Sequence, residues 1–287
     1  MKSMRKPIGL LTFVALFSCD STDVRRPTRR SGSSTPNTSV DAGATGVDAG
    51  TSTGCIGDSA FTGQIGDTEV PNGGTAIFTP YPTDYNAGIE NLISAISQID
   101  GETADVNIMI TGATVVATLP NAPESLPQSN TTFWVADSNG TIEVRIFYPG
   151  ITEAEYPSFA IKTGQKISFR VTKVERFYER GQVQQATDWI LEETNQPVYI
   201  WEPNRELNTT DVHQFVRING RLEGEGTNCG TNYKCLNIDY GQGTPAIFRT
   251  PPRFGDTGSC VTFVGPVSSF DGALQFNVEN LSWLKLY

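Results

Sequence analysis

Strict alternation of apolar and polar residues over short segments is the feature that most constrains how this chain can fold. Residues 165–176 (QKISFRVTKVER) show it most clearly, because Ile167, Phe169 and Val171 alternate with polar neighbours. A period of two puts alternate side chains on opposite faces of a β-strand, whereas a helix repeats its apolar residues every three or four positions. We therefore expect this segment to be a strand with one buried face.

Five strand-like segments follow one another in the first part of the folded region. The second and third flank Ser138-Asn139-Gly140, a sequence typical of a hairpin turn. Together with Asp137 it also resembles a fragment of a calcium loop, but the remaining ligands are missing, so a turn is favoured. The expected strands are residues 106–119, 131–137, 141–148, 165–176 and 184–192.

The same order of segments returns nearer the C-terminus at shorter spacing. Gly220 interrupts the opening segment there as Gly112 interrupts the first one, and Gly241 follows the second segment as Gly140 follows residues 131–137. An internal repeat of this kind predicts two copies of one β unit. The expected strands of the second copy are residues 212–223, 235–240, 245–249, 258–264 and 273–286.

Three short sequences in the first unit carry a resemblance to a known fold. They are Ile110-Thr111-Gly112-Ala113, then residues 133–137 (FWVAD) with Gly140, then residues 164–167 (GQKI). The pattern resembles the OB-fold domains of many exported bacterial proteins, in which five strands close into a barrel. The resemblance implies a mainly β chain with two tandem five-stranded OB-like barrels.

One segment has helical periodicity instead. Within residues 87–100, Ile89, Leu92, Ile93 and Ile96 fall on one face of a helix. We expect one short helix here that closes the open end of the first barrel, in preference to a helix that binds a partner.

The N-terminus has the composition of a secretory signal. Three basic residues precede residues 8–17 (IGLLTFVALF), an apolar run too short to span a membrane. Residues 16–19 (LFSC) resemble the lipobox of bacterial lipoproteins, which implies cleavage before Cys19 and attachment of diacylglycerol to its sulfur. An ordinary signal peptide followed by an unrelated cysteine is the alternative.

The next residues have the composition of a linker. Residues 19–54 are dense in Ser, Thr, Gly and Asp, and such a stretch cannot bury enough apolar surface to fold, so a disordered tether is expected. Its repeated VDAG sequence resembles the tethers of myxobacterial lipoproteins. The expected organisation is a signal peptide over residues 1–18, the tether over 19–54, the first barrel with an N-terminal extension and the helix over 55–204, and the second barrel over 205–287.

Four cysteines remain once Cys19 is assigned to the lipid. An even number in an exported, oxidising compartment favours disulfides, with three possible connectivities. Cys229 and Cys235 bracket a tight loop rich in Gly and Asn, which favours local closure and would leave Cys55 to pair with Cys260. A zinc site is the alternative, but the spacings lack CxxC pairs and offer no His partner.

Charge and histidine content exclude some functions. The net charge is −10, and removal of residues 1–18 would lower it to −13. Because attraction to phosphate dominates affinity for nucleic acid, an oligonucleotide partner is disfavoured. The single histidine, His213, leaves no multi-His metal site, and no Ser-His-Asp triad unless it carries that role itself. We therefore expect no enzyme, no metal, no catalytic residue and no cofactor apart from the acyl lipid on Cys19.

OB folds often bind oligonucleotides or oligosaccharides across their second and third strands. In the first unit the side chains that could form such a face are aromatic or arginine, although Trp134 cannot share a face with Phe133 or Val135, and core packing is the favoured role for the aromatics. The candidates are Trp134, Arg145, Tyr148, Arg170, Arg176 and Arg180.

The sequence as a whole favours a membrane-anchored envelope lipoprotein that binds another envelope protein or a glycan through its barrel loops. The sequence does not decide between the outer membrane and the periplasmic face of the inner membrane. The alternatives are polysaccharide or oligonucleotide binding by the OB face, a purely structural accessory subunit, and a glycan hydrolase with paired carboxylates.

Overall fold

The computed structural model describes residues 55, 76–99, 102–119, 131–146, 156–177, 180–230, 233–279 and 281–287. All of them belong to one unit, Asp48–Tyr287. The expected signal peptide, Cys19, the tether and Tyr148 lie outside the described residues, and Arg180 is described only in its backbone. No helix within the described ranges has the length and apolarity to span a bilayer.

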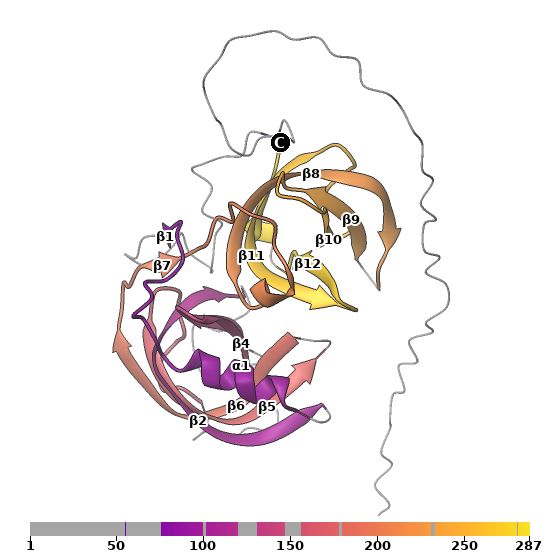
Figure 1. Cartoon of the computed structure of the whole chain (residues 1–287). Coiled ribbons are helices and arrows are strands. Elements are labelled where there is room, and N and C mark those ends of the chain that lie inside the picture. Colours follow the sequence, from indigo (N-terminus) through magenta and orange to yellow (C-terminus); the bar gives the residue numbers. More distant parts are fainter. Residues whose placement is uncertain are drawn as a thin grey trace, which may run out of the picture. The chain divides into compact units, whose positions relative to one another are not determined.

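Five strands form the first barrel (Figure 1), and their order is β2-β3-β4-β6-β5, closed on itself. The third strand of the barrel, β4, pairs with the fifth, β6, in parallel, while the other pairs are antiparallel. This is the Greek-key order of an OB-fold. The strands are β2 (Thr103–Thr118), β3 (Thr131–Asp137), β4 (Gly140–Ile146), β5 (Lys166–Phe177) and β6 (Arg180–Glu193).

Alternation along these strands builds the interior as the sequence predicted. Phe133 and Val135 of β3 and Phe169 of β5 are fully buried, and the Trp189 ring of β6 stacks on Phe169 with ring centroids 4.7 Å apart. Gly112 lies where the register between β2 and β5 shifts, with φ at 68°. This left-handed conformation is strained for residues with a side chain, which explains the glycine at the expected bend.

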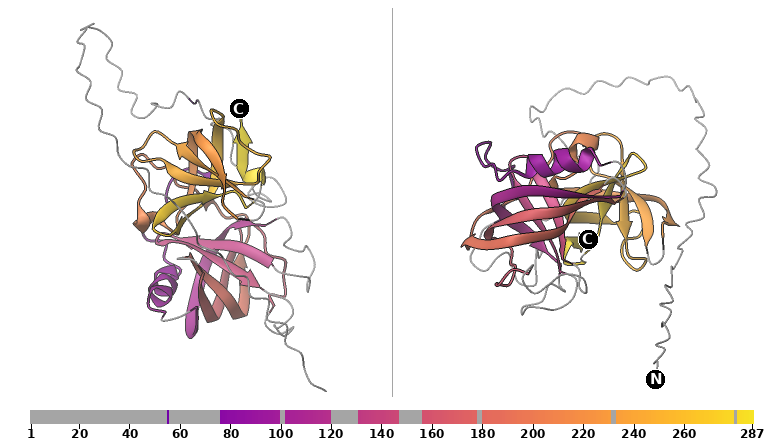
Figure 2. Two further views of the ribbon diagram at one scale, coloured as in Figure 1. Left: turned by 90° about the vertical axis from the view of Figure 1, so that its right-hand side faces the viewer. Right: turned by 90° about the horizontal axis from the view of Figure 1, so that it is seen from below.

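The expected helix is α1 (Ile89–Ser97), which covers the interior of the first barrel (Figures 1 and 2). Ile89 and Leu92 are fully buried in the same apolar cluster as the strands, and Ile96 is nearly so. The helix begins later than the sequence suggested because Gly88 takes a left-handed conformation at its N-cap. The expectation of a helix that closes the barrel is confirmed.

The second barrel repeats the same order. Because β12 pairs with both β10 and β11, and β11 pairs with β8, the pairings close into the ring β8-β9-β10-β12-β11. Here too the third strand, β10, pairs with the fifth, β12, in parallel. The strands are β8 (Phe215–Asn228), β9 (Lys234–Asp239), β10 (Ala246–Thr250), β11 (Cys260–Phe270) and β12 (Ala273–Asn277).

The sequence was wrong about the last strand. Residues 273–286 form β12, then the 3₁₀ turn η3 (Leu281–Trp283), then β13 (Leu284–Leu286), which pairs with β11. Both strands pair antiparallel with β11, but Val267 pairs with Phe276 whereas Phe263 pairs with Leu284, so extra residues lie between the two pairings. These residues include η3, which buries Trp283 in the cluster with Trp134 and Phe215.

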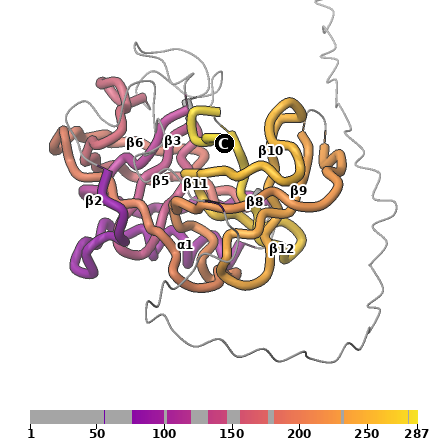
Figure 3. The backbone as a smooth tube through the Cα atoms, turned by 90° about the horizontal axis from the view of Figure 1, so that it is seen from above, coloured from indigo at the N-terminus to yellow at the C-terminus, as the bar shows by residue number. Residues whose placement is uncertain are grey.

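A short sheet also joins the segment before the first barrel to the segment between the barrels. β1 (Ala76–Ile77) pairs in parallel with β7 (Val198–Tyr199), and Trp201 bridges to Val216 at the start of β8. A 3₁₀ turn, η2 (Thr209–Asp211), then precedes β8. The backbone tube in Figure 3 shows β2, β5 and β6 grouped in one barrel and β8, β9 and β10 in the other.

Two disulfides are present. Cys229 pairs with Cys235 across the loop between β8 and β9, and Cys55 pairs with Cys260 at the start of β11. This is the pairing that local closure of the 229–235 loop favours.

Candidate functional site

The outer face of β3 and β4 is where an OB barrel of this order would bind a ligand. In the first barrel this face is buried. Trp134 is 2% exposed, and Thr141 and Glu143 are each 5% exposed. Trp134 stands directly opposite Glu143 in the register of the two strands. The face is therefore closed to a ligand, and its cover comes from the second barrel.

An apolar cluster joins the two barrels across this face. The indole of Trp134 meets that of Trp283 edge to face at 5.1 Å, and Trp283 meets the Phe215 ring at 5.7 Å. Trp283 is fully buried. The backbone contributes as well, because the Thr141 N–H donates to the His213 carbonyl at 2.5 Å. The interface is thus an interior of well-packed aromatic rings.

This arrangement corrects the predicted ligand face at its centre. Trp134 does point outward from its own barrel, as its parity with Phe133 requires, but its ring is buried against Trp283. The sequence could not show this, because the cover is formed by a 3₁₀ turn near the C-terminus, about 150 residues away in the chain.

The arginines of the predicted face do not meet on one surface. Arg145 on β4 pairs with Glu143, and Arg170 on β5 pairs with Asp188 at 2.8 Å and donates to Asn107 at 2.8 Å. Arg176 is exposed near the end of β5, and β6 separates that strand from β4. Each of the first two guanidiniums is already satisfied by a neighbour, so the set is not brought together as a site.

No described segment covers the equivalent face of the second barrel. It lies on β9 and β10, where Asn237 stands opposite Ile247 and the disulfide-bonded Cys235 stands opposite Arg249. Asn237 is exposed, and Ile247 and Arg249 are half-buried. Glu223 on β8 stands opposite Asn237 and is exposed. A ligand could reach this face without any rearrangement of the barrel.

Arg249 is the distinctive side chain of this open face. Its guanidinium lies over the Tyr233 ring at 4.0 Å from the centroid, a cation–π contact that fixes its position. Its Nε is buried and donates to no acceptor, and no carboxylate within the described ranges pairs with it. Buried donors are nearly always satisfied, so the unsatisfied Nε sets Arg249 apart from the other side chains of this face.

The loop that carries Tyr233 is held in place by its disulfide. Cys229 and Cys235 close it, and the Cys229 N–H donates to the Tyr233 carbonyl at 3.2 Å. These two contacts hold Tyr233 beside Arg249 of β10, and a side chain held in place before binding loses less entropy when a ligand binds.

Charge is divided unevenly between the barrels. Residues 55–204 contain seven basic and nineteen acidic residues, whereas residues 205–287 contain seven basic and eight acidic residues. The acidity that disfavours an anionic partner thus belongs to the first barrel. The second barrel, which has the open face, is close to neutral.

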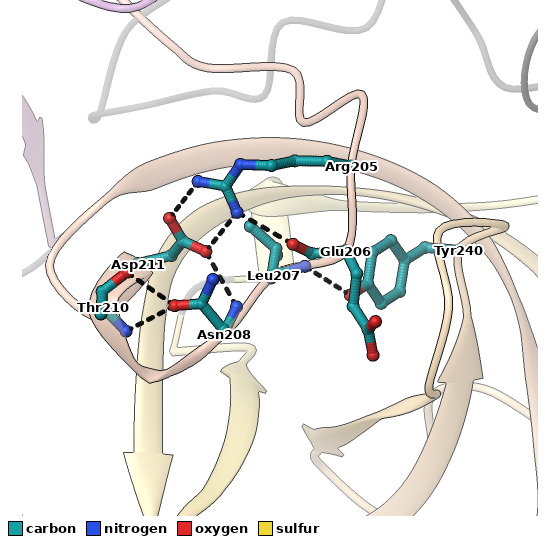
Figure 4. A network of polar contacts seen from close by, with 7 residues as sticks. All are labelled: Arg205, Glu206, Leu207, Asn208, Thr210, Asp211 and Tyr240. Atoms are coloured by element: carbon teal, nitrogen blue, oxygen red, sulfur yellow. Dashed lines mark hydrogen bonds and ion pairs between the residues drawn. The ribbon is translucent and has the colours of Figure 1, made fainter.

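A polar network positions the segment that leads into β8 (Figure 4). The Arg205 guanidinium donates to both carboxylate oxygens of Asp211, at 2.7 and 2.8 Å. Asn208 accepts from the Thr210 N–H at 2.9 Å, and the Leu207 N–H donates to the Tyr240 hydroxyl at 3.2 Å. Burial raises the pKa of Asp211, but the hydrogen bonds from Arg205 and from the Asn208 backbone outweigh it and leave that pKa below its ordinary range.

His213 lies at the junction of the barrels. Its N–H donates to the Val267 carbonyl at 3.4 Å and its own carbonyl accepts from Thr141. Burial of the imidazole lowers its pKa to about 4. Both backbone groups of His213 are therefore used in joining strands.

No group of three His, Cys, Asp or Glu side chains that could hold a metal ion occurs within the part of the chain that the structure describes. The expectations that the protein has no metal, no cofactor and no catalytic activity remain predictions.

Sequence reasoning missed Arg249, Tyr233 and Asn237. Alternation along residues 235–240 and 245–249 could have found Asn237 and Arg249, because both are the outward residues of strands that were predicted. Nothing local to Trp134 could have shown that the first face is closed and the second one open.

Comparison with known proteins gives little beyond the strand order. No family model matches the chain, and no curated protein matches it. Among solved structures, a p202 HIN2 domain crystallised as a tetramer has a TM-score of 0.31 at 12% identity, over 66% of this chain and 96% of that one. A murine DNA-binding protein solved with double-stranded DNA has a TM-score of 0.33 at 12% identity, over 63% and 94%.

A replication protein A heterotrimer bound to single-stranded DNA overlaps at a TM-score of 0.24 and 14% identity, covering 67% of this chain and 50% of that one. Such scores are too low to carry an argument, so the assignment of class rests on the two closed Greek-key barrels themselves. They define a tandem OB-fold protein whose second barrel has the open face.

Proposed function

We propose that this protein is an exported, lipid-anchored binding protein of the cell envelope, in which the second barrel presents the ligand face and the first barrel supports it. The lipobox-like sequence that ends at Cys19 supports the anchor. The two disulfides are consistent with an oxidising compartment outside the cytoplasm. The proposal assigns no catalytic step to the chain.

One observation carries the choice of ligand face. Of two equivalent OB faces, the first is buried under Trp283, and the second is open and contains Arg249 without a carboxylate partner in the described part of the chain. A ligand at the first face would have to expose the cluster around Trp134 to water, which is unfavourable for apolar surface. A ligand at the second face displaces only solvent.

The chemistry of Arg249 favours a ligand with an anionic group. A guanidinium forms paired hydrogen bonds with carboxylates and phosphates, and these are stronger than bonds between neutral groups. The exposed Asn237 amide on the neighbouring strand adds a neutral donor and acceptor. We propose that the ligand is a polysaccharide segment with carboxylate-bearing sugars.

A single-stranded oligonucleotide is the second candidate. The observation that favours it is the near-neutral charge of the second barrel, together with an arginine–tyrosine pair of the kind on which bases stack. The acidic first barrel opposes it, because the phosphates would be repelled over the length of a strand.

The experiment measures binding to the full mature chain by isothermal titration calorimetry. Its probes are hexagalacturonate, uncharged maltohexaose and the oligonucleotide dT12. We expect hexagalacturonate to bind, Arg249→Ala to weaken it by about tenfold or more, and Arg249→Lys to be intermediate because the bidentate geometry is lost. Arg253→Ala is the matched control, since Arg253 is exposed in the same barrel, and we expect less than about a twofold effect.

Equal binding by the Arg249→Ala and wild-type proteins would show that this face is not the site. Binding of dT12 in preference to hexagalacturonate would select the second candidate. The lipid anchor is tested separately by labelling cells with radioactive palmitate. The Cys19→Ala protein should not incorporate the label and should be absent from the membrane fraction. Incorporation of label by this variant would refute the anchor.

A further inference from the structure

A pocket lies outside both OB faces, and the proposed function does not use it. Three tyrosines form its walls: Tyr81 stacks on Tyr85 with centroids 5.2 Å apart and planes at 19°, and Tyr199 lies at 4.9 Å from Tyr81. We call this the tyrosine pocket. Its volume is about 350 Å³, and it is lined by Tyr81, Pro82, Asp84, Tyr85, Thr114, Lys166, Gln196, Pro197 and Tyr199.

The tyrosine pocket is built from segments far apart in the sequence. Tyr81 and Tyr85 come from the segment before α1, Tyr199 from β7, and Thr114 and Lys166 from β2 and β5. The outer face of β3 and β4, where Trp134 is buried, contributes no residue to it. It is therefore a site distinct from the OB faces.

The walls of the pocket are held rigidly. The Tyr85 hydroxyl donates to the Gly112 carbonyl at 2.5 Å and shares a hydrogen bond with Thr114 Oγ1 at 2.7 Å. The Tyr85 carbonyl accepts from the Ser138 N–H at 2.8 Å, which ties this segment to the β3–β4 turn. Tyr199 is paired with Ile77 in the short parallel sheet. A pocket with fixed walls loses little entropy when it is filled.

The pocket has few charged groups. The Lys166 ammonium pairs with Glu193 at 3.2 Å, and Asp84 lies exposed at the rim. Burial raises the pKa of Tyr85 to about 12 and that of Tyr81 further still, so both phenols stay neutral at physiological pH. Because Lys166 is paired, the one charge left over among the lining residues is the exposed carboxylate of Asp84, and no unpaired cation in the lining selects an anion.

The remaining chemistry is a set of aromatic faces with donors and acceptors around them. The Gln196 amide and the Lys166 ammonium can donate, and Asp84 and the amide oxygen can accept. A sugar ring matches this combination, because it presents C–H groups on its faces and hydroxyls on its edge. The volume is near the lower end of the range for ligand pockets, which suits one or two rings.

A proline-rich peptide is the closest rival, because such peptides also bind between tyrosines and prolines. A polyproline helix advances about 3 Å per residue and needs an elongated trough with few polar groups. The tyrosine pocket is small and polar along one side. We propose that it binds one or two rings of a neutral saccharide, as a site separate from the Arg249 face.

The test titrates the full mature chain with three neutral hexasaccharides, maltohexaose, cellohexaose and chitohexaose, and with decaproline. We expect one of the saccharides to bind, Tyr199→Ala to weaken it by about tenfold, and Tyr199→Phe to retain it, because the ring provides the stacking surface. Gln196→Ala should weaken it by a smaller factor. Arg253→Ala is the control, since Arg253 is exposed in the second barrel and has no assigned role, and it should leave this binding unchanged.

Several results would overturn the proposal. They are no saccharide binding up to roughly 10 mM, undiminished binding by a folded Tyr199→Ala protein, or binding of decaproline in place of the sugars. Circular dichroism checks that Tyr199→Ala folds. If it does not, Gln196→Ala decides, since Gln196 is only half-buried and lies outside the strands. Failure here would leave the Arg249 measurements unaffected, so the two assignments can be told apart.

Discussion

His213 is held in a left-handed backbone conformation, with φ at 84°, where the barrels meet. Its carbonyl lies against Gly140, where a Cβ would approach the oxygen to 3.1 Å, so the close approach of the two chain segments needs a glycine on one side. The imidazole lies in an environment that burial makes unfavourable for its charged form. The backbone of His213 joins strands of the two barrels, and the lowered pKa of its imidazole is a consequence of the buried position that this requires.

We predict that His213 makes the protein less stable as pH falls from about 6.5 towards 4. Its folded pKa of about 4 is below that of the unfolded chain, so over this interval only the unfolded state takes up the proton. His213→Asn should remove this dependence, because asparagine tolerates positive φ and does not titrate. The measurement is urea unfolding at pH 7 and pH 4.5, with an expected difference of about 2 kcal/mol for wild type.

Titration of Asp211 does not contribute to the stability difference between pH 7 and pH 4.5. Its depressed pKa means that its contribution to stability is present above the unfolded pKa of about 3.9 and is lost only as pH falls through the lower folded value. That interval lies below pH 4.5. If His213→Asn kept the wild-type pH dependence, another group would have to be responsible.

At the scale of elements, α1 depends on a carboxylate from a turn that follows it by 40 residues. Asp137 Oδ2 accepts from the Ala87 N–H at 2.8 Å and the Ile89 N–H at 3.2 Å, and Asp137 is 2% exposed. Free N–H groups at a helix start require acceptors, and a negative charge there interacts favourably with the helix dipole. The β3–β4 hairpin therefore both turns the chain and fixes the helix that covers the barrel.

We predict that Asp137→Ala lowers the free energy of unfolding by about 2 kcal/mol, because two buried backbone donors lose their acceptor. Asp137→Asn keeps an oxygen acceptor and should cost less. Asp105→Ala, at an exposed position on β2, is the control and should change stability by less than about 0.5 kcal/mol. Urea denaturation measures all three, and equal loss for Asp137→Ala and Asp105→Ala would show that the contact is not stabilising.

At the scale of the whole molecule, the two disulfides constrain very different lengths of chain. Cys55 and Cys260 are 205 residues apart in sequence, whereas Cys229 and Cys235 are 6 apart. A cross-link stabilises mainly by reducing the entropy of the unfolded chain, and the effect grows with the logarithm of the loop. The first bond should therefore stabilise the fold as a whole, and the second should fix the Tyr233 loop.

We predict that the double variant Cys55→Ser, Cys260→Ser loses about 5 kcal/mol of stability and that Cys229→Ser, Cys235→Ser loses about 2 kcal/mol. The Cys229→Ser, Cys235→Ser variant should in addition lose affinity for the ligand of Arg249, because Tyr233 is no longer held in place. Urea unfolding and calorimetry of both variants measure the two effects. A larger loss of stability from the short loop would contradict the entropic account.

Much of this architecture is determined locally, and the sequence predicted it for that reason. Alternation put Phe133 and Val135 on the opposite face of the strand from Trp134, and the structure places the first two inside the barrel. The Asp137–Gly140 stretch forms a turn, and residues near 89–97 form a helix with its apolar face inward. Each of these depends on residues within a few positions of one another. The repeat of five segments then predicted two barrels, and the strand pairings confirm them.

Only the tertiary structure decided which surfaces are free. The outward direction of Trp134 follows from its parity with Phe133, but its burial depends on contact with Trp283. Arg249 faces outward in the second barrel, where no described segment packs over its strand in the same way. The tyrosine pocket likewise unites Tyr85, Lys166 and Tyr199 from three distant segments. Periodicity reports which side of a strand a residue faces. Contact between distant segments is set by packing of the whole chain, and no local pattern contains it.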